Sequence, residues 1–423
     1  MGRTYVYAAA LNRQGRLSGG SAGKESSGIY CFVLDTQNGK LSFAHFTKLQ
    51  DTGNLVISPD GRFVYAAIES RDFPDGLPGS GGGIAAFRAD PSDGSLRLLN
   101  TSCSYGSRTC YLSLTKTGKF LLAANHGSHS AAVCRYEKDA EGNWHLQRLL
   151  DDSSVAVFAI AQDGSIGSLT DLRQFTSHGY YTDGGGQSTS HIHCVQIHDT
   201  NFVAAANRGG DRLETFRLNT ENGQLENDQS CAGKAGLAPR HLVYHPSLPV
   251  FYVCHENFPC VTTWRMDAVK NRIAEIQRMD TMPPAYMEKH PNRFPDAEQP
   301  FENKPPKCIV LPSEVLPADI HVHPSGRYLY VSNRTKDGSA GSIAVFSICK
   351  ENGLASFLGI RPVPDCNPRG FAISPDGNYA VVCLMQTGKL AVYPIDPESG
   401  MLQEASDHAS VPICCNVRIV SRP

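Results

Sequence analysis

Apolar and polar residues alternate in short runs along the whole chain, and one pattern recurs. In residues 317–334, two apolar runs, I-H-V-H and Y-L-Y-V-S, flank P-S-G-R, whose Pro, Ser and Gly are typical of a reverse turn. This pattern predicts a β-hairpin. Five further segments repeat it, at 54–69, 109–126, 190–208, 239–256 and 368–386. Several copies of one hairpin indicate a repeat protein.

A second strand pair with its own pattern accompanies these hairpins. An alternating apolar run leads through a polar turn into a shorter apolar strand. Seven such pairs occur, at 28–43, 83–99, 155–169, 212–226, 261–276, 342–357 and 389–404. Asn-Gly, Asp-Gly or Ser-Gly at the turn provides the positive φ that tight hairpins need. One inner and one outer hairpin together predict a four-stranded antiparallel sheet.

The two chain ends supply the inner hairpin that is otherwise missing. Residues 4–9 have the pattern of its second strand and residues 411–420 that of its first, so the ends would meet in one sheet. A ring of sheets closed in this way has no free edge. The predicted fold class is therefore all-β, a seven-bladed β-propeller of four-stranded antiparallel blades in which N- and C-terminal strands share one blade.

We predict a single domain over residues 1–423, because each repeat adds its own slice of core. Two segments interrupt the period. Residues 133–152 indicate an added strand pair, and residues 281–316, which are rich in Pro and polar side chains, indicate a long surface loop. A linker between two domains is the alternative for the second segment, but the blade pattern resumes on both sides of it.

Composition narrows the classes of partner. The formal net charge of −2 provides no electrostatic footprint for a nucleic acid or an anionic membrane. The N-terminal residues lack a signal-peptide layout, and no segment is apolar enough over sufficient length to span a bilayer. The 14 cysteines are scattered singly, which favours reduced, buried thiols in a cytoplasmic protein.

The geometry of a propeller decides which polar residues can meet. In each inner hairpin, the start of the first strand and the end of the second lie together at one mouth of the ring. The residues at these positions are Asn54, Glu69, Asn125, His126, His191, His193, Asn207, Arg208, Arg240, His241, His255, Glu256, Asp319, Asn333, Arg334, Arg369, Gln386 and Asn416. Guanidinium groups suit carboxylate or phosphate oxygens, and His or Glu suits proton transfer. The ring predicts a site for a small anionic ligand.

Structural roles stay open for the same residues. His193 could be a satisfied group at the start of a strand, and Arg240 and Arg334 could bridge neighbouring blades through carboxylates. The two H-x-H pairs, at 191–193 and 321–323, could ligate a metal ion. No third ligand follows at a recognisable spacing, so we predict neither a metal nor another cofactor.

The sequence resembles a known family over nearly the whole chain, and four segments are the most specific parts of this resemblance. They are Q-S-T-S-H-I-H-C (187–194), P-R-H-L-V-Y-H-P (239–246), A-D-I-H-V-H-P-S-G-R-Y-L-Y-V-S-N-R (318–334) and N-P-R-G-F-A-I-S-P-D-G (367–377). The family is that of the seven-bladed propeller lactonases, which includes the bacterial propeller type of 6-phosphogluconolactonase and the fungal 3-carboxy-cis,cis-muconate lactonizing enzymes. The resemblance implies four catalytic residues here: His193, Arg240, Glu256 and Arg334. This chain departs from the family at Asp319, where members usually have the longer Glu.

The resemblance implies a lactonase that hydrolyses the ester bond of a small acidic sugar-type lactone, similar to 6-phosphogluconolactone. Glu256, or His193 with its help, would deprotonate water, and Arg240 and Arg334 would hold the anionic group of the substrate. The substrate-binding residues that we predict beside them are His191, Arg208, His241, Asp319, Arg369 and Gln386. Two alternatives remain open, a cycloisomerase of the carboxymuconate lactonizing type and a propeller scaffold that binds without turnover.

Overall fold

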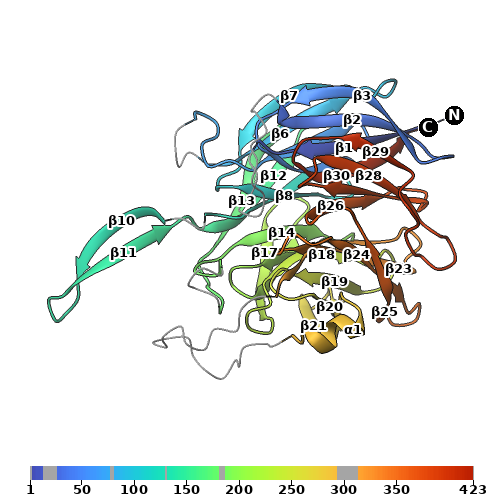
Figure 1. Ribbon diagram of the computed structural model, residues 1–423. Coiled ribbons are helices and arrows are strands. Elements are labelled where there is room, and N and C mark those ends of the chain that lie inside the picture. Colours follow the sequence, from blue (N-terminus) through green and yellow to red (C-terminus); the bar gives the residue numbers. More distant parts are fainter. Residues whose placement is uncertain are drawn as a thin grey trace.

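Seven four-stranded antiparallel sheets form a ring, which confirms the predicted β-propeller (Figure 1). The computed structural model describes residues 2–12, 26–76, 81–128, 131–180, 186–292 and 313–422. In each sheet the strands follow one another from the central axis outwards, and the innermost strands of neighbouring blades lie against each other all around the ring.

The blades are numbered here in chain order, each from its innermost strand outwards. Blade 1 consists of β30 (Cys414–Arg422), β1 (Arg3–Ala10), β2 (Gly28–Asp35) and β3 (Lys40–Lys48). Blade 2 consists of β4 (Thr52–Ile57), β5 (Phe63–Ile68), β6 (Gly83–Ala89) and β7 (Leu96–Cys103). Blade 3 consists of β8 (Thr109–Leu114), β9 (Phe120–Asn125), β12 (Ser153–Ile160) and β13 (Ile166–Phe175). Blades 4 and 5 are β14 (Ile192–Ile197), β15 (Phe202–Asn207), β16 (Arg212–Leu218) and β17 (Leu225–Ala232); and β18 (Pro239–Tyr244), β19 (Val250–His255), β20 (Cys260–Asp267) and β21 (Arg272–Asp280). Blades 6 and 7 are β22 (Val315–Val322), β23 (Tyr328–Thr335), β24 (Ser342–Ile348) and β25 (Ala355–Pro362); and β26 (Pro368–Ile373), β27 (Tyr379–Leu384), β28 (Lys389–Pro394) and β29 (Asp407–Ser410).

Both chain ends contribute to blade 1, as predicted. Strand β30 pairs antiparallel with β1, and Arg3 lies opposite Arg422. The two ends of the chain accordingly lie side by side in Figure 1. This pairing leaves no open edge between the first and last blades.

Two segments depart from the four-strand repeat. Strands β10 (Ala131–Lys138) and β11 (Trp144–Leu150) form a separate two-stranded sheet between β9 and β12, and this sheet projects away from the ring (Figure 1). It is the strand pair expected near 133–152. Of the segment expected to be a loop at 281–316, residues 293–312 lie outside the described part. The rest includes a short helix, α1 (Pro284–Lys289), which we did not predict. The sequence Pro283-Pro284 suggested a loop, but Pro is also favoured in the first turn of a helix.

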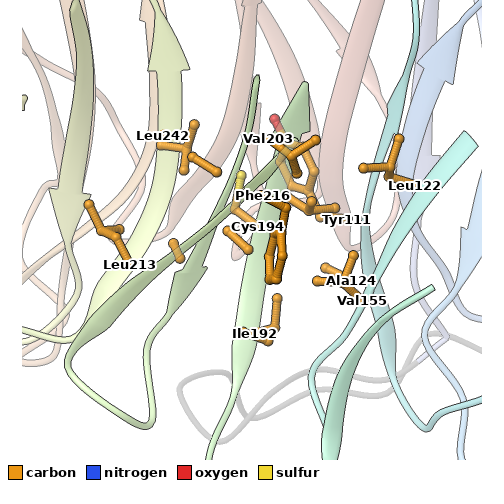
Figure 2. Close-up of a cluster of buried hydrophobic side chains, with 14 of the residues drawn as sticks. Tyr111, Leu122, Ala124, Val155, Ile192, Cys194, Val203, Leu213, Phe216 and Leu242 are labelled. Carbon is orange, nitrogen blue, oxygen red and sulfur yellow. The ribbon is translucent and has the colours of Figure 1, made fainter. Parts of the chain in front are cut away.

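The hydrophobic core lies between neighbouring blades. Figure 2 shows one such cluster, in which Leu122 of blade 3, Ile192 and Phe216 of blade 4, and Leu242 of blade 5 are buried together. Alternate residues of a strand point to opposite faces of its sheet. The second strand of each blade can therefore pack against the blades on both of its sides, which explains why these second strands are apolar at almost every position.

A repeated hydrogen bond ties four of the blades to the next blade. In each case a tyrosine on the second strand donates its hydroxyl hydrogen to the carbonyl oxygen of a turn glycine between the two outer strands of the following blade. The pairs are Tyr7 with Gly94 at 2.9 Å, Tyr65 with Gly164 at 3.0 Å, Tyr252 with Gly353 at 2.7 Å and Tyr330 with Gly400 at 2.8 Å. All four glycines have positive φ, and a Cβ atom on any of them would overlap a side chain of the preceding blade. The hairpin glycines thus serve the contact between blades as well as the turn.

We expect Tyr330→Phe to lower the free energy of unfolding by about 1–2 kcal/mol, because the carbonyl oxygen of Gly400 loses its buried donor. Tyr393 is the matched control. Its hydroxyl is buried without a hydrogen-bond partner in the described part of the chain, so Tyr393→Phe should leave the free energy unchanged or raise it. Urea denaturation of both variants measures the difference. Equal destabilisation would contradict a role for the hydrogen bond between blades.

Candidate active site

The innermost strand of every blade contains a β-bulge near its start. The pairing of this strand with the second strand shifts register there, so that a residue is left without an opposite partner. The bulged residues are Cys415, Gly53, Cys110, His193, Arg240, Asp319 with Ala318, and Arg369, in blades 1 to 7. A bulge re-aims the side chain of the extra residue. One residue from each of the seven bulges lines a cavity at the centre of the ring.

The chemistry of this ring is confined to one side. The bulges of four consecutive blades carry His193, Arg240, Asp319 and Arg369, which are all residues that the sequence placed in the site. The bulges of the other three blades carry only Gly or Cys. The structure therefore brings the predicted imidazole, guanidinium and carboxylate groups together on neighbouring strands.

Glu256 directly follows β19 and lies among three arginines. Its Oε2 atom is 3.0 Å from Nε of Arg240 and 3.0 Å from Nε of Arg208. Its Oε1 atom is 3.4 Å from Nη2 of Arg208 and 3.6 Å from Nη2 of Arg334. Burial raises the pKa of Glu256, but the three guanidinium charges outweigh burial and hold this pKa well below its usual range. Glu256 is consequently ionised at neutral pH, and both of its oxygens are engaged.

A hydrogen-bonded chain fixes the position of Arg240, whose side chain is only 2% exposed. Its Nη1 atom lies 3.0 Å from Nε2 of His241, and Nδ1 of His241 lies 2.8 Å from Oδ1 of Asp319. A guanidinium only donates, so Nε2 of His241 accepts and its Nδ1–H is donated to Asp319. Burial lowers the pKa of His241 to about 4, which agrees with a neutral ring.

Asp319 holds its neighbours with both oxygens. Besides His241, it accepts from Nε2 of His321 at 3.1 Å and from the backbone N–H of Phe371 at 3.2 Å. Asp319 was predicted to bind substrate, with its short side chain as the uncertain point. In the structure its carboxylate lines the central cavity, and its hydrogen bonds join blades 5, 6 and 7.

His193 is 7% exposed and lies edge-on to His126 and His241, with ring centroids 5.3 and 5.1 Å apart. Its Nδ1 atom is buried and has no hydrogen-bond partner within the described ranges. Burial, followed by the charge of Arg240, lowers the pKa of His193 well below 6.5. The ring is therefore a neutral imidazole whose buried Nδ1 atom makes no hydrogen bond within the described ranges.

His191 lies beside this group but is held differently. Its Nδ1 atom is 2.8 Å from the carbonyl oxygen of His126, to which it donates, and the two imidazole rings stack at 4.4 Å. Burial lowers the pKa of His191 to about 4. His191 thus positions His126 next to His193.

Of the remaining predicted residues, one lies in the site and one does not. Arg208 belongs to the group around Glu256, and it also donates to the carbonyl oxygen of Gly186 at 2.8 Å. Gln386 is exposed beyond the end of β27, and the structure does not join its side chain to the cavity. His323 belongs to one of the two H-x-H pairs that could ligate a metal ion. Its Nε2 atom instead lies 2.9 Å from the carbonyl oxygen of Gly377 in the next blade. Within the described residues, no group of three His, Cys, Asp or Glu side chains could hold a metal ion.

Three cavity residues were in the predicted ring but were not selected as site residues: Asn54, Asn416 and Glu69, of which only Glu69 is ionisable. Glu69 follows β5 and lies over the bulge of its own blade, where a Cβ atom on Gly53 would come within 2.6 Å of its Oε2 atom. The absence of a side chain at Gly53 therefore makes room for the carboxylate. The signal for Glu69 in the sequence was Gly53, because the corresponding positions of four other blades carry His, Arg or Asp.

The model of the family described as "Lactonase, 7-bladed beta-propeller" matches residues 16–419. The chain belongs to this family. A 6-phosphogluconolactonase of Formosa agariphila is 25% identical over 386 residues, which cover 90% of this chain and 92% of that protein. A 6-phosphogluconolactonase of Bacillus subtilis is 26% identical over 388 residues, which cover 92% and 93% of the two chains.

Solved structures show the same fold. The periplasmic gluconolactonase PpgL of Pseudomonas aeruginosa superposes with a TM-score of 0.75 at 20% identity, over 99% of this chain and 100% of that chain. A protein from Lactobacillus plantarum superposes with a TM-score of 0.73 at 22% identity, over 99% and 100% of the two chains. Family membership favours a lactone hydrolase over a cycloisomerase or a scaffold without turnover, neither of which these relatives support.

The cysteines and helices add two observations. The 12 cysteines whose side chains the structure describes have free thiols. Burial raises the pKa of Cys110 and of Cys415 at the cavity, so neither thiol is a nucleophile at neutral pH. None of the described helices is long and apolar enough to cross a membrane.

Proposed function

We propose that this lactonase hydrolyses the ester bond of a small anionic sugar lactone of the 6-phosphogluconolactone type. The observation that carries the proposal is the group of three arginines around Glu256, one of which, Arg240, lines the same cavity as the neutral imidazole of His193. The named relatives that align over nine-tenths of this chain are 6-phosphogluconolactonases, which supports the same substrate class.

The charge balance of the site also favours an anionic substrate. The imidazoles of His191, His193 and His241 are neutral. The charged groups are the four guanidiniums of Arg208, Arg240, Arg334 and Arg369 and the three carboxylates of Glu69, Glu256 and Asp319. One positive charge is in excess, and a phosphate or carboxylate of the substrate would offset it.

The mechanism assigns base and charge stabiliser to different residues. His193 takes a proton from water at a ring nitrogen while the water oxygen bonds to the lactone carbonyl carbon. Arg240 and Arg334 stabilise the oxyanion that forms on the carbonyl oxygen. When the ring C–O bond breaks, the departing oxygen takes the proton from His193, and the new carboxylic acid loses its own proton to solvent. Glu256 is too weak a base for the first step, so it positions the arginines.

Acid release tests the proposed function. Fresh 6-phosphogluconolactone and an unphosphorylated gluconolactone are compared in a weakly buffered indicator assay, with spontaneous hydrolysis subtracted. We expect the protein to accelerate release from both and faster release from the phosphorylated lactone. No rate above background with either would overturn the proposal. Conversion of an unsaturated diacid to a lactone, without hydrolysis of either substrate, would select the cycloisomerase.

The acid limb of the pH profile should lie below 6.5, the ordinary pKa of histidine. The neutral form of His193 is the active one, and its lowered pKa keeps the ring neutral as the pH falls through 6.5. We therefore expect kcat/KM to remain level from neutral pH through 6.5 and to decline only at lower pH. Initial rates of acid release measure this, and a limb centred at or above 6.5 would contradict the assignment of the base.

Folding must be followed in the same experiment. Burial lowers the pKa of His191 and His241 to about 4 and that of His255 to about 3. The unfolded chain takes up protons at these residues as the pH falls below 6.5, whereas the folded protein does so only near the lowered values. Stability is thus lost progressively over this window. Circular dichroism at each pH separates unfolding from protonation of His193.

A further inference from the structure

The cavity inside the ring of bulges has the size of one small molecule. Its free volume is ≈ 10 Å³, which is close to the smallest space that holds a water molecule. A water molecule in a protein interior needs two to four polar partners. His193 and Arg240 lie on the wall of this cavity, and so do Glu69 and Arg369. The proposed mechanism has so far used only the first two.

Glu69 and Arg369 differ from the other charged residues of the site because their charged groups are uncommitted. Arg240, Glu256 and Asp319 are all engaged by protein atoms. By contrast, the side chains of Glu69 and Arg369 make neither a hydrogen bond nor an ion pair with any residue in the described ranges. Burial lowers the pKa of Arg369, but the surrounding groups together, with Glu69 first among them, raise it above its ordinary value, so Arg369 carries its charge. The cavity thus has a free donor and a free acceptor.

The other side of the ring limits the size of the cavity. The thiol of Cys110 lies 3.4 Å from the carbonyl oxygen of His193, and the thiol of Cys415 lies 3.4 Å from that of Thr52. Both sulfur atoms are packed against backbone. Gly53 completes this side and leaves space for the carboxylate of Glu69. Small residues at three consecutive bulges therefore keep a space open without enlarging it.

We propose that this cavity binds the water molecule that attacks the lactone, and that Glu69 and Arg369 orient it. The inference rests on the proposed function. The water donates one hydrogen to a ring nitrogen of the neutral His193, which lines the cavity, and the other to the carboxylate of Glu69, while Arg369 donates to one lone pair of the water oxygen. The second lone pair remains for the carbonyl carbon. On attack, the new C–O bond forms from this lone pair and the proton passes to His193, so Glu69 and Arg369 are unchanged.

The first test separates water positioning from substrate binding. Glu69→Gln and Arg369→Lys should each lower kcat for acid release by about 100-fold, because a misplaced nucleophile reacts slowly, and should leave KM within about twofold. Arg62→Met is the matched control, since Arg62 lies at the opposite end of the hairpin that carries Glu69 and is 64% exposed. Circular dichroism verifies the fold of each variant. A rise in KM with unchanged kcat would show that the pair binds substrate, and would overturn the inference.

The second test uses the size of the cavity and begins with the unaltered protein. In water–methanol mixtures, a cavity of this size should exclude methanol as the nucleophile, so the enzyme should produce only the open-chain acid. Cys415→Ala removes one sulfur atom from the wall, and this variant should also produce the methyl ester, which is detected by mass spectrometry. Cys349→Ala, at an outer hairpin turn, is the control and should produce acid alone.

The outcomes distinguish this inference from the function on which it rests. Methyl ester formed by the unaltered enzyme in proportion to methanol would show that the nucleophile comes from open solvent, and would overturn the inference while the lactonase proposal stands. A protein that hydrolyses neither lactone overturns both.

Discussion

Arg240→Lys is expected to lower kcat/KM for a phosphorylated sugar lactone by roughly 100- to 1000-fold, the usual cost of losing a preorganised donor to an oxyanion. Lysine keeps the positive charge but cannot form the guanidinium bonds to Glu256, His241 and the carbonyl oxygen of Ala318 together. The charge would remain in the site without its direction. Initial rates of acid release by the Arg240→Lys enzyme and by the unaltered enzyme measure the effect.

Arg278→Lys is the matched control for this prediction. Arg278 lies in the same blade and pairs with Glu275 at the surface, so its replacement should change kcat/KM by less than about twofold. An Arg240→Lys enzyme with activity close to that of the unaltered protein would contradict the role of the guanidinium in catalysis. Arg240→Ala is the less informative change, because it leaves the buried Glu256 without one of its partners and costs stability as well.

Much of the fold could be predicted because each repeat is encoded locally. The second strand of each inner hairpin has apolar residues at nearly every position, since both faces of this strand are buried between blades. The outer hairpins alternate, and a turn glycine marks where six of the seven pairs reverse, with Asn271 at positive φ in the seventh. Closure could be predicted from the two unmatched half-hairpins at the chain ends. Helix α1 could not, because six residues that begin at the second proline of Pro283-Pro284 have too little periodicity to indicate a helix.

Only one argument from the sequence could locate the site, namely that the strand ends of the inner hairpins meet at one mouth of a propeller. That argument placed His193, Arg240 and Glu256 together without any contact being known. It could not reveal the bulges, because a single extra residue leaves normal apolar patterns on both sides of it. For example, Pro239 pairs with His255 and His241 with Cys254, and Arg240 lies between them unpaired. It also could not assign the roles of charges that neutralise each other, since those depend on distances across blades.

The assignment of Glu256 as a positioning residue leads to the second large effect. Glu256→Gln is expected to lower kcat/KM by about 100-fold or more, because the arginines lose the carboxylate that orients them and an amide N–H₂ group would face guanidinium donors. The charge that is lost leaves an excess on Arg208, Arg240 and Arg334. Inorganic phosphate should therefore bind about tenfold more tightly to the variant, as a replacement anion, and should inhibit it more strongly.

Two readouts decide between this role and that of a general base. If Glu256 positions the arginines, the acid limb of the residual activity still reports His193, and added formate does not restore the rate. If Glu256 is the base, formate restores part of the rate and the inhibition by phosphate is unchanged, which would contradict our assignment. Glu404→Gln is the control, because Glu404 pairs with Arg361 through a carboxylate that is 90% exposed. That variant should match the unaltered enzyme in rate and in inhibition, since a surface ion pair has little influence on a distant site.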